Sequence, residues 1–266
     1  MRPTAFAAAL LLVSSPAAAV AQDVFHSTQS ANLPTARIMP GGSWHFEISH
    51  RFDRPFSAGG DALWGLDGPA YNRLVLTYSI SDRFAAGVQR TNVEDNVELN
   101  LKARAWEIGS DRFAFEAAVM AGAAWNTQVF EVDGAEDNEM QAYGQAILNA
   151  RLGTRIALGV VPTYLYNPRL RDFEEESALA LGAYGQLYFS GSASLFGEWV
   201  VSEERVDHEN DSATFGLEFE TRGHFFKLLV TNQARLNPTQ VLAGTATNFE
   251  PDEWRFGFNI QRLLPF

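Results

Sequence analysis

The sequence contains no cysteine in its 266 residues. This excludes disulfides, thiolate metal sites, a cysteine nucleophile and a lipid anchor on an N-terminal cysteine. After position 21 there is no run of about 18 apolar residues, so no membrane-spanning helix is expected. Basic residues are also the minority, because 20 Lys and Arg stand against 32 Asp and Glu and give a net charge of −12. Binding to phosphate backbones requires a basic surface, so nucleic acid is not an expected partner.

The first residues have the features of a secretory signal peptide. Arg2 supplies the positive start, residues 5–13 are apolar, and Ala19-Val20-Ala21 forms a small-x-small cleavage site before Gln22. We therefore expect residues 1–21 to be removed on export. Residues 22–42, rich in Pro and Gly, are expected to form a periplasmic or lumen-entering lead-in.

After residue 42, apolar and polar residues alternate with a period of two much more often than with a helical period. Each alternating stretch has roughly the 9 to 11 residues that a tilted strand needs to cross an outer membrane. The clearest stretches are 44–52, 71–80, 97–108, 113–125 and 254–266.

The connections between these stretches fall into two kinds. Five are short and place Ser, Asp, Gly or Arg between two alternating stretches, as hairpin turns do. Six are mostly longer and acidic: residues 53–70, 93–96, 130–139, 167–177, 203–212 and 236–252. Eleven connections join about twelve strands, with both termini at the short-turn end, which is typical of a bacterial outer-membrane barrel.

Aromatic residues on the apolar faces form two bands. One band lies at the short-turn end and the other at the long-loop end, as expected for two membrane interfaces. A soluble sandwich or lipocalin-like barrel has no membrane interfaces and would not be expected to place its aromatic residues in two bands. The sequence therefore predicts an all-β fold, an antiparallel up-and-down transmembrane barrel over residues 43–266, closed by the C-terminal strand. The members of the bands are Trp44, Phe46, Phe84, Phe113, Phe115, Phe189, Phe226 and Phe266, and Tyr71, Trp125, Tyr164, Tyr166 and Trp254.

Three motifs in the first third of the mature chain resemble a family of outer-membrane β-barrel domains of unknown function. They are "EISHRF" (47–52), "GLDG" (65–68) and "LTYSISDRFAAGVQR" (76–90). Ser79 stands where the family has a glycine. The resemblance implies a barrel and carries no reaction.

The chain ends on Phe266 after alternating apolar residues, which resembles the C-terminal signal read by the barrel-insertion machinery. Arg262 and Pro265 depart from that pattern. The expected location is the outer membrane of a Gram-negative-type cell. Outer-membrane lipid is an expected partner, and the acidic loops would gather divalent cations that bridge lipopolysaccharide.

Four arginines are expected at one height inside the external mouth. Arg51 ends the first strand, Arg73 begins the second, Arg235 ends the penultimate strand and Arg255 begins the last. Closure makes these four strands neighbours, which predicts an arginine ladder. Either the first and last loops fold inward, with Asp67 pairing with Arg51 or Arg73 as a latch, or the ladder stays hydrated and guides small anions.

Charges on the inward parity are nearly balanced, so they line a pore or cross-link a closed lumen equally well. The two functions that remain are a narrow passive channel for small solutes, with anions as one option, and a closed structural or interaction barrel. The other inward charges are Glu47, Glu98, Lys102, Arg104, Glu116, Arg151, Glu198, Glu218, Glu220 and Lys227.

Enzymatic and metal sites are weaker hypotheses. His45 and Ser49 share a strand face with Glu47, but residues four apart on a strand are roughly 13 Å apart, too far for a base and its nucleophile. His208 lies in an acidic loop without a second loop histidine. The acidic runs at 131–139 and 172–177 lack the regular spacing of a calcium loop. We therefore expect no catalytic residue, metal or cofactor.

Overall fold

The computed structural model describes residues 23–110, 112–128, 140–168, 177–203 and 210–264. The predicted signal peptide, the acidic runs at 131–139 and 172–176, His208 and Phe266 lie outside the described residues. Among the described residues no helix is long and apolar enough to cross a membrane.

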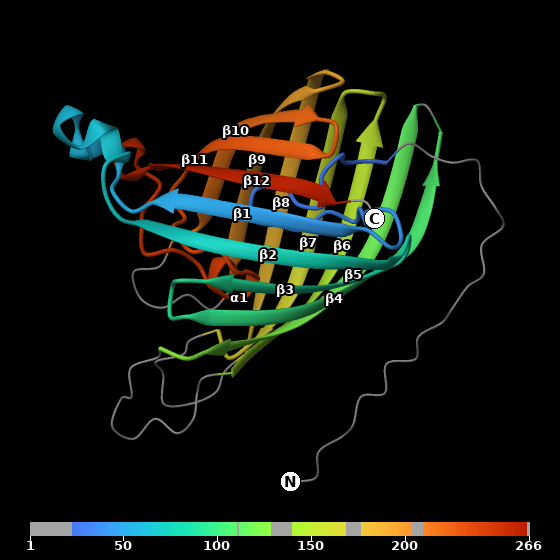
Figure 1. Ribbon diagram of the computed structural model, residues 1–266, viewed down its shortest axis with the longest axis horizontal. Helices are drawn as coiled ribbons and strands as arrows, with labels where there is room; N and C mark the ends of the chain where they lie inside the picture. Colours follow the sequence, from blue (N-terminus) through green and yellow to red (C-terminus); the bar gives the residue numbers. More distant parts are fainter. Residues whose placement is uncertain (1–22, 111, 129–139, 169–176, 204–209, 265–266) are drawn as a thin grey trace, which may run out of the picture.

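Twelve antiparallel strands close into a single barrel in which each strand pairs with its neighbours in sequence (Figure 1). The register between the first and last strands, which includes Ile48 opposite Ile260, completes the closure. The predicted fold class is confirmed. The strands are β1 (Trp44–Phe52), β2 (Ala70–Ser81), β3 (Phe84–Thr91), β4 (Asn96–Gly109), β5 (Phe113–Asn126), β6 (Met140–Leu152), β7 (Ile156–Tyr166), β8 (Ser177–Ser190), β9 (Ala193–Ser202), β10 (Ser212–Thr221), β11 (His224–Thr231) and β12 (Arg255–Leu264).

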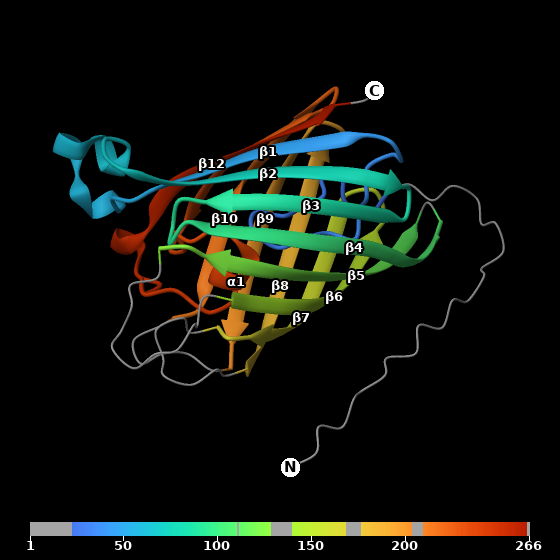
Figure 2. The same ribbon diagram turned by 60° about the horizontal axis from the view of Figure 1, so that its bottom comes forward.

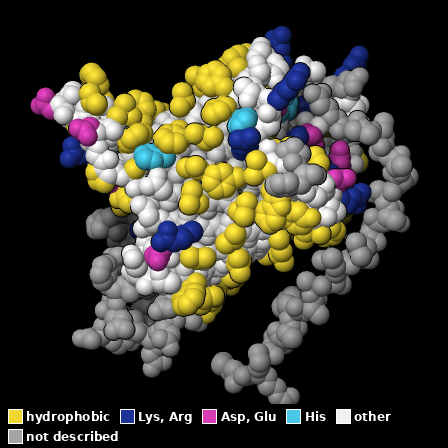
Figure 3. All heavy atoms as spheres, viewed as in Figure 1, with side chains coloured by type: hydrophobic (Ala, Val, Ile, Leu, Met, Phe, Trp, Pro, Cys, Tyr) yellow, Lys and Arg dark blue, Asp and Glu magenta, His cyan; other side chains and the backbone are white. Residues whose placement is uncertain are grey.

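Side chains alternate between a lipid-side face and a lumen face because successive Cβ atoms point to opposite sides of a strand. On β4, Leu99 and Leu101 are 64% and 65% exposed, whereas Glu98 is buried. Hydrophobic side chains cover much of the outer surface seen in Figure 3. An apolar exterior around a polar wall is the arrangement expected of a membrane barrel.

Residues 23–39 form a hairpin inside the barrel. Ser30 N–H donates to the Leu33 carbonyl at 2.8 Å, and an isolated bridge joins Gln29 to Pro34. Val24 and Leu33 are fully buried although they belong to no strand of the barrel. The chain leaves the lumen at the short-turn end, where Gly42 N–H donates to the Ser79 carbonyl. We call residues 23–39 the hairpin plug (Figure 2).

The β11–β12 connection also enters the lumen, from the long-loop end. It carries the one-turn helix α1 (Pro238–Val241), all of whose residues are buried. Gln240 donates to the Val93 carbonyl and Asn237 donates to Asn96, so the connection reaches across to the loop between β3 and β4. The barrel is therefore filled from both ends by its own chain.

The β1–β2 connection does not fold inward. It contains two short 3-10 helices, η1 (Phe56–Ala58) and η2 (Gly60–Gly65), and it projects from the barrel at the left of Figure 1. Leu63 and Trp64 are more than half exposed. A third 3-10 helix, η3 (Pro251–Glu253), leads into β12. Of the two loops expected to fold inward, only the last does so.

Candidate functional site

The tip of the hairpin plug is held by one buried carboxylate on β9. The backbone N–H groups of Ala31, Asn32 and Leu33 all donate to Glu198 Oε2, at 3.1, 3.0 and 3.0 Å. The Asn32 side chain donates to Glu198 Oε1 at 2.8 Å. Glu198 is 3% exposed, and a buried charge of this kind persists only where donors surround it. The N–H groups of the plug tip thus replace the water molecules that would solvate an exposed carboxylate.

A buried lysine on β11 binds hydrogen-bond acceptors of the plug. Lys227 Nζ donates to Ser27 Oγ at 3.0 Å and to the carbonyls of Gln29 and Ser30. It also forms an ion pair with Glu218 at 2.7 Å. The wall therefore offers an acceptor on β9 and a donor on β11, and the plug binds both.

Arg51 connects the plug tip to β12. Its guanidinium donates to Asn32 Oδ1 at 2.9 Å and to Asn259 Oδ1 at 2.8 Å. Asn259 in turn donates to the Ala31 carbonyl at 2.7 Å. Arg51 is fully buried, so each of these acceptors lies inside the lumen.

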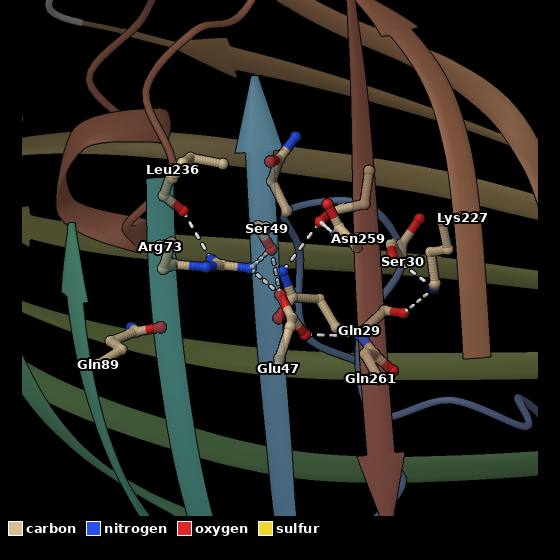
Figure 4. A network of polar contacts seen from close by, with 12 residues as sticks. Gln29, Ser30, Glu47, Ser49, Arg73, Gln89, Lys227, Leu236, Asn259 and Gln261 are labelled. Atoms are coloured by element: carbon tan, nitrogen blue, oxygen red, sulfur yellow. Dashed lines mark hydrogen bonds and ion pairs between the residues drawn. The ribbon is translucent and has the colours of Figure 1, made fainter. Parts of the chain in front are cut away.

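Arg73 connects β1 to the β11–β12 connection (Figure 4). It forms an ion pair with Glu47 and donates to the Leu236 carbonyl at 2.7 Å. Glu47 also accepts hydrogen bonds from Ser49 and from Gln261. The predicted latch is not formed, because Asp67 is exposed and Glu47 occupies the place expected for its carboxylate.

The expected arginine ladder divides into two parts. Arg51 and Arg73 are buried in the network, whereas Arg255 is half-buried and donates to Thr247 Oγ1. Arg235 does not end a strand as predicted, because β11 ends at Thr231. There Asn232 takes over the pairing, since its side chain accepts the N–H of Ala213 on β10.

The wall opposite the charged network is apolar. Val24, Phe25 and Leu33 of the plug belong to one buried cluster with side chains from β5 to β9 and with Val241 and Leu242. The wall members of this cluster are Ala114, Ala118, Tyr143, Ile147, Ala157, Val161, Leu165, Ala178, Ala180, Tyr184, Tyr188 and Val200.

A few polar contacts cross this apolar side. The N–H of Val24 donates to Glu116, and the N–H of Ala36 donates to Asn149 Oδ1 at 2.7 Å. Lys102 Nζ donates to the Thr35 carbonyl at 3.1 Å. The plug is therefore bonded to the wall along its length and not at the tip alone.

Little free space remains between plug and wall. One cavity there measures about 60 Å³, and Gln29, His45, Glu47 and Lys102 are among the residues that line it. A cavity of this size holds a few water molecules. This cavity is too small to hold a larger solute.

Sequence reasoning missed the plug residues that contact the wall. Asn32 carries no periodic signal, because it lies before the first alternating stretch, whereas its neighbour Asn259 lies on the polar face of the last one. The clearest overlooked sign is Gly182, on the inward face of β8, where a Cβ would lie 2.4 Å from Leu33 Cδ1. An inward glycine in mid-strand indicates that another part of the chain approaches closely.

The described residues give little support to a hydrolase. Ser49 Oγ donates to Glu47, and His45 is 3% exposed, so both lie under the plug. On the outer face, His50 stands opposite Asn72 and stacks on Phe258, with Phe52 as its other ring neighbour. No group of three potential metal ligands occurs in the part of the chain that the structure describes.

The chain matches a family of membrane-bound β-barrel domains, DUF5777, over residues 25–264. The protein therefore belongs to this family, and the matched range includes nearly all of the hairpin plug. No curated protein matches its sequence.

Several solved outer-membrane barrels are similar in structure. The KdgM porin is 8% identical with a TM-score of 0.49, covering 84% of this chain and 99% of its own. The COG4313 outer membrane channel from Pseudomonas putida F1 is 11% identical with a TM-score of 0.48, covering 86% and 98%. The outer membrane phospholipase A from Escherichia coli is 12% identical with a TM-score of 0.42, covering 85% and 93%. The strand register, and not these similarities, establishes the barrel.

Proposed function

We propose that this protein is an outer-membrane channel for small solutes, closed in the described conformation by the hairpin plug and the β11–β12 connection. The observation that carries the proposal is that the Glu198 carboxylate accepts three backbone hydrogen bonds from the plug tip. Hydrogen bonds between backbone N–H groups and a carboxylate can be exchanged for hydrogen bonds to water. The closed state is therefore held by exchangeable contacts. No enzymatic step is part of the proposal.

The energetic terms for closure are of similar size. Ordering the backbone of each plug residue costs about 1–2 kcal/mol. Each hydrogen bond to the wall returns a net of about 1 kcal/mol, and each buried large apolar side chain returns about 1.5–3 kcal/mol. Because the opposing terms are comparable, removal of one strong contact should change the open fraction markedly.

The charges that the plug covers support a preference for solutes with acceptor oxygens. When the plug leaves, Arg51 loses Asn32 and Lys227 loses three acceptor oxygens. Small carboxylates could occupy these donors, while Glu198 would limit the net positive potential. Under a salt gradient, the reversal potential should favour anions, and Arg51→Ala with Arg255→Ala should remove that preference.

The decisive experiment is single-channel conductance of the refolded protein. Glu198→Ala should increase the frequency of openings about tenfold or more, because the N–H groups of the tip lose their shared acceptor. Glu250→Ala removes an exposed carboxylate from the β11–β12 connection and serves as the matched control. Equal conductance of wild type and both variants would contradict gating by the plug.

A closed structural barrel is the second candidate, favoured by the apolar cluster that joins the plug to α1. The absence of native cysteine allows a direct test with Ala31→Cys, because Ala31 is fully buried at the tip. A channel predicts slow labelling by a membrane-impermeant maleimide, accelerated by Glu198→Ala. Ser57→Cys, in the exposed part of the β1–β2 connection, is the positive control. A tip that is never labelled, together with absent conductance, favours the closed barrel.

A further inference from the structure

The end of the barrel with the short turns carries a set of exposed arginines. Arg83, Arg112, Arg155 and Arg222 lie in four different short turns, and Arg262 lies near the end of β12. All five are exposed. Figure 3 shows Lys and Arg side chains along this end, which lies at the right of the view. We call these five residues the arginine rim.

Main-chain hydrogen bonds place members of the rim in neighbouring pairs. Gly153 N–H donates to the Arg112 carbonyl at 2.8 Å, which joins the turn of Arg112 to that of Arg155. Leu263 N–H donates to the Gly223 carbonyl at 2.8 Å, and each of these residues follows an arginine of the rim. Like charges held side by side repel unless a counter-charge lies between them.

The described acidic residues at this end are engaged elsewhere. Asp82 accepts the N–H of Gly41, Glu107 pairs with Arg104, and Glu220 pairs with His26. Within the described residues, which omit Asp111, no side chain of the arginine rim forms an ion pair or a hydrogen bond. The guanidinium groups of the rim are therefore available to bind anions.

A band of exposed phenylalanines lies next to the rim. Phe84 and Phe113 directly follow Arg83 and Arg112 and are 50% and 44% exposed. Aromatic rings in barrels settle at the level of the lipid headgroups. Arginines one residue further from the barrel centre then lie at the depth of the lipid phosphates, and their guanidinium groups match phosphate oxygens two at a time. The other members of the band are Phe189, Phe219 and Phe226.

We propose that the arginine rim binds anionic phospholipids of the leaflet into which the short turns project. Phosphates would bridge Arg112 to Arg155 and Arg222 to Arg262, which relieves the repulsion within each pair. The proposal depends on the membrane location of the barrel and not on channel activity.

The test uses the full mature chain in nanodiscs of phosphatidylcholine alone or mixed equally with phosphatidylglycerol. Native mass spectrometry then counts the phosphatidylglycerol molecules that remain bound. Arg112→Gln with Arg155→Gln should lower the apparent affinity for phosphatidylglycerol about tenfold or more. The matched control, Arg54→Gln with Arg90→Gln, removes two exposed arginines from the long-loop end and should leave retention unchanged.

Two further measurements make the result decisive. Thermal unfolding in phosphatidylcholine alone should be the same for the wild type and the rim variant, which separates lipid binding from folding. About 1 M salt should abolish the preference of the wild type, because the Debye length falls to about 3 Å. Equal retention by wild type and rim variant, or equal loss in the control, would overturn the proposal. Displacement of the lipid by matched inorganic phosphate would assign the rim to free phosphate instead.

Discussion

The two halves of the lumen wall differ sharply in chemistry although the same chain folds against both. The half formed by β1, β2 and β9–β12 is charged and hydrogen-bonded, whereas the half formed mainly by β5–β8 is apolar and rich in alanine. The charged half includes Glu47, Ser49, Arg51, Arg73, Glu218, Lys227, Asn259 and Gln261. The apolar half includes Ala114, Ala118, Ile147, Ala157, Val161, Leu165, Ala178 and Ala180.

The hairpin plug presents apolar side chains to the apolar half and polar groups to the charged half. Its Phe25 packs on Tyr184 with ring centroids 5.1 Å apart, and its Asn32 contacts Glu198 and Arg51. Apolar contacts are short-ranged and favour one tight fit, whereas hydrogen bonds can be exchanged with water at modest net cost. The apolar half therefore fixes where the plug sits, and the charged half determines whether it can leave.

The largest effect is expected from breaking the charged half. Glu47→Gln removes the carboxylate that neutralises Arg73, and both side chains are 1% exposed. An uncompensated buried charge costs about 3–5 kcal/mol. We expect the free energy of unfolding to fall by about that amount in reversible urea titrations of the lipid-refolded protein.

A second variant separates the lost charge from lost packing. Glu47→Gln combined with Arg73→Met removes both members of the pair and should recover much of the lost stability, since replacing a whole buried pair is often nearly neutral. A double variant as unstable as the sum of the two single variants would show that the pair is not coupled.

The apolar half should respond to changes of volume. Leu33→Ala leaves a cavity and should lower the free energy of unfolding by about 2–3 kcal/mol. Gly182→Ala brings a Cβ against the Leu33 side chain and should cost about 1–3 kcal/mol. The two substitutions together should cost less than their sum, because the smaller side chain at position 33 makes room for the new methyl group. Strict additivity in urea titrations would mean that the plug does not pack on β8.

Much of the barrel could be predicted from the sequence because a strand turns alternate side chains to opposite faces. That rule assigned Glu98, Glu198 and Lys227 to the wall without knowledge of their partners. The plug could not be predicted in the same way, since residues 23–39 have no strand period and their partners are distant in sequence. Leu33 and Glu198, for example, are 165 residues apart.

The end of β11 shows where alternation misleads. The inward parity of β11 continues through Thr231 and Gln233 to Arg235, but polar Asn232 stands where an apolar outward residue is expected. Its side chain accepts the Ala213 N–H, and the regular ladder ends there. Asn232 also donates to the carbonyls of Asp211 and Thr247, which turns the chain into the lumen. Competition between a side chain and the backbone for hydrogen bonds is local chemistry that periodicity does not register.

A smaller effect is expected where the plug tip meets β12. Asn259→Ala removes one acceptor of Arg51 and one donor to the Ala31 carbonyl. Arg51 keeps its bond to Asn32, so the expected loss in the free energy of unfolding is about 1–2 kcal/mol. Urea titration should give this value, and Asn248→Ala, in the partly exposed segment before η3, should change stability much less. A loss as large as that of Glu47→Gln would contradict the partial redundancy at Arg51.

The smallest effect is expected at Asp67, in the β1–β2 connection that stays outside the lumen. Its side chain is exposed, and Glu47 already neutralises Arg73. Asp67→Asn should therefore change the free energy of unfolding by less than about 0.5 kcal/mol, as is usual for surface substitutions. Because Glu47→Gln removes a negative charge by the same amide replacement, the pair of variants compares an inside carboxylate with an outside one. A large loss at Asp67 would mean that the β1–β2 connection folds inward in the membrane and closes on the arginines, beside the β11–β12 connection at the same end of the barrel.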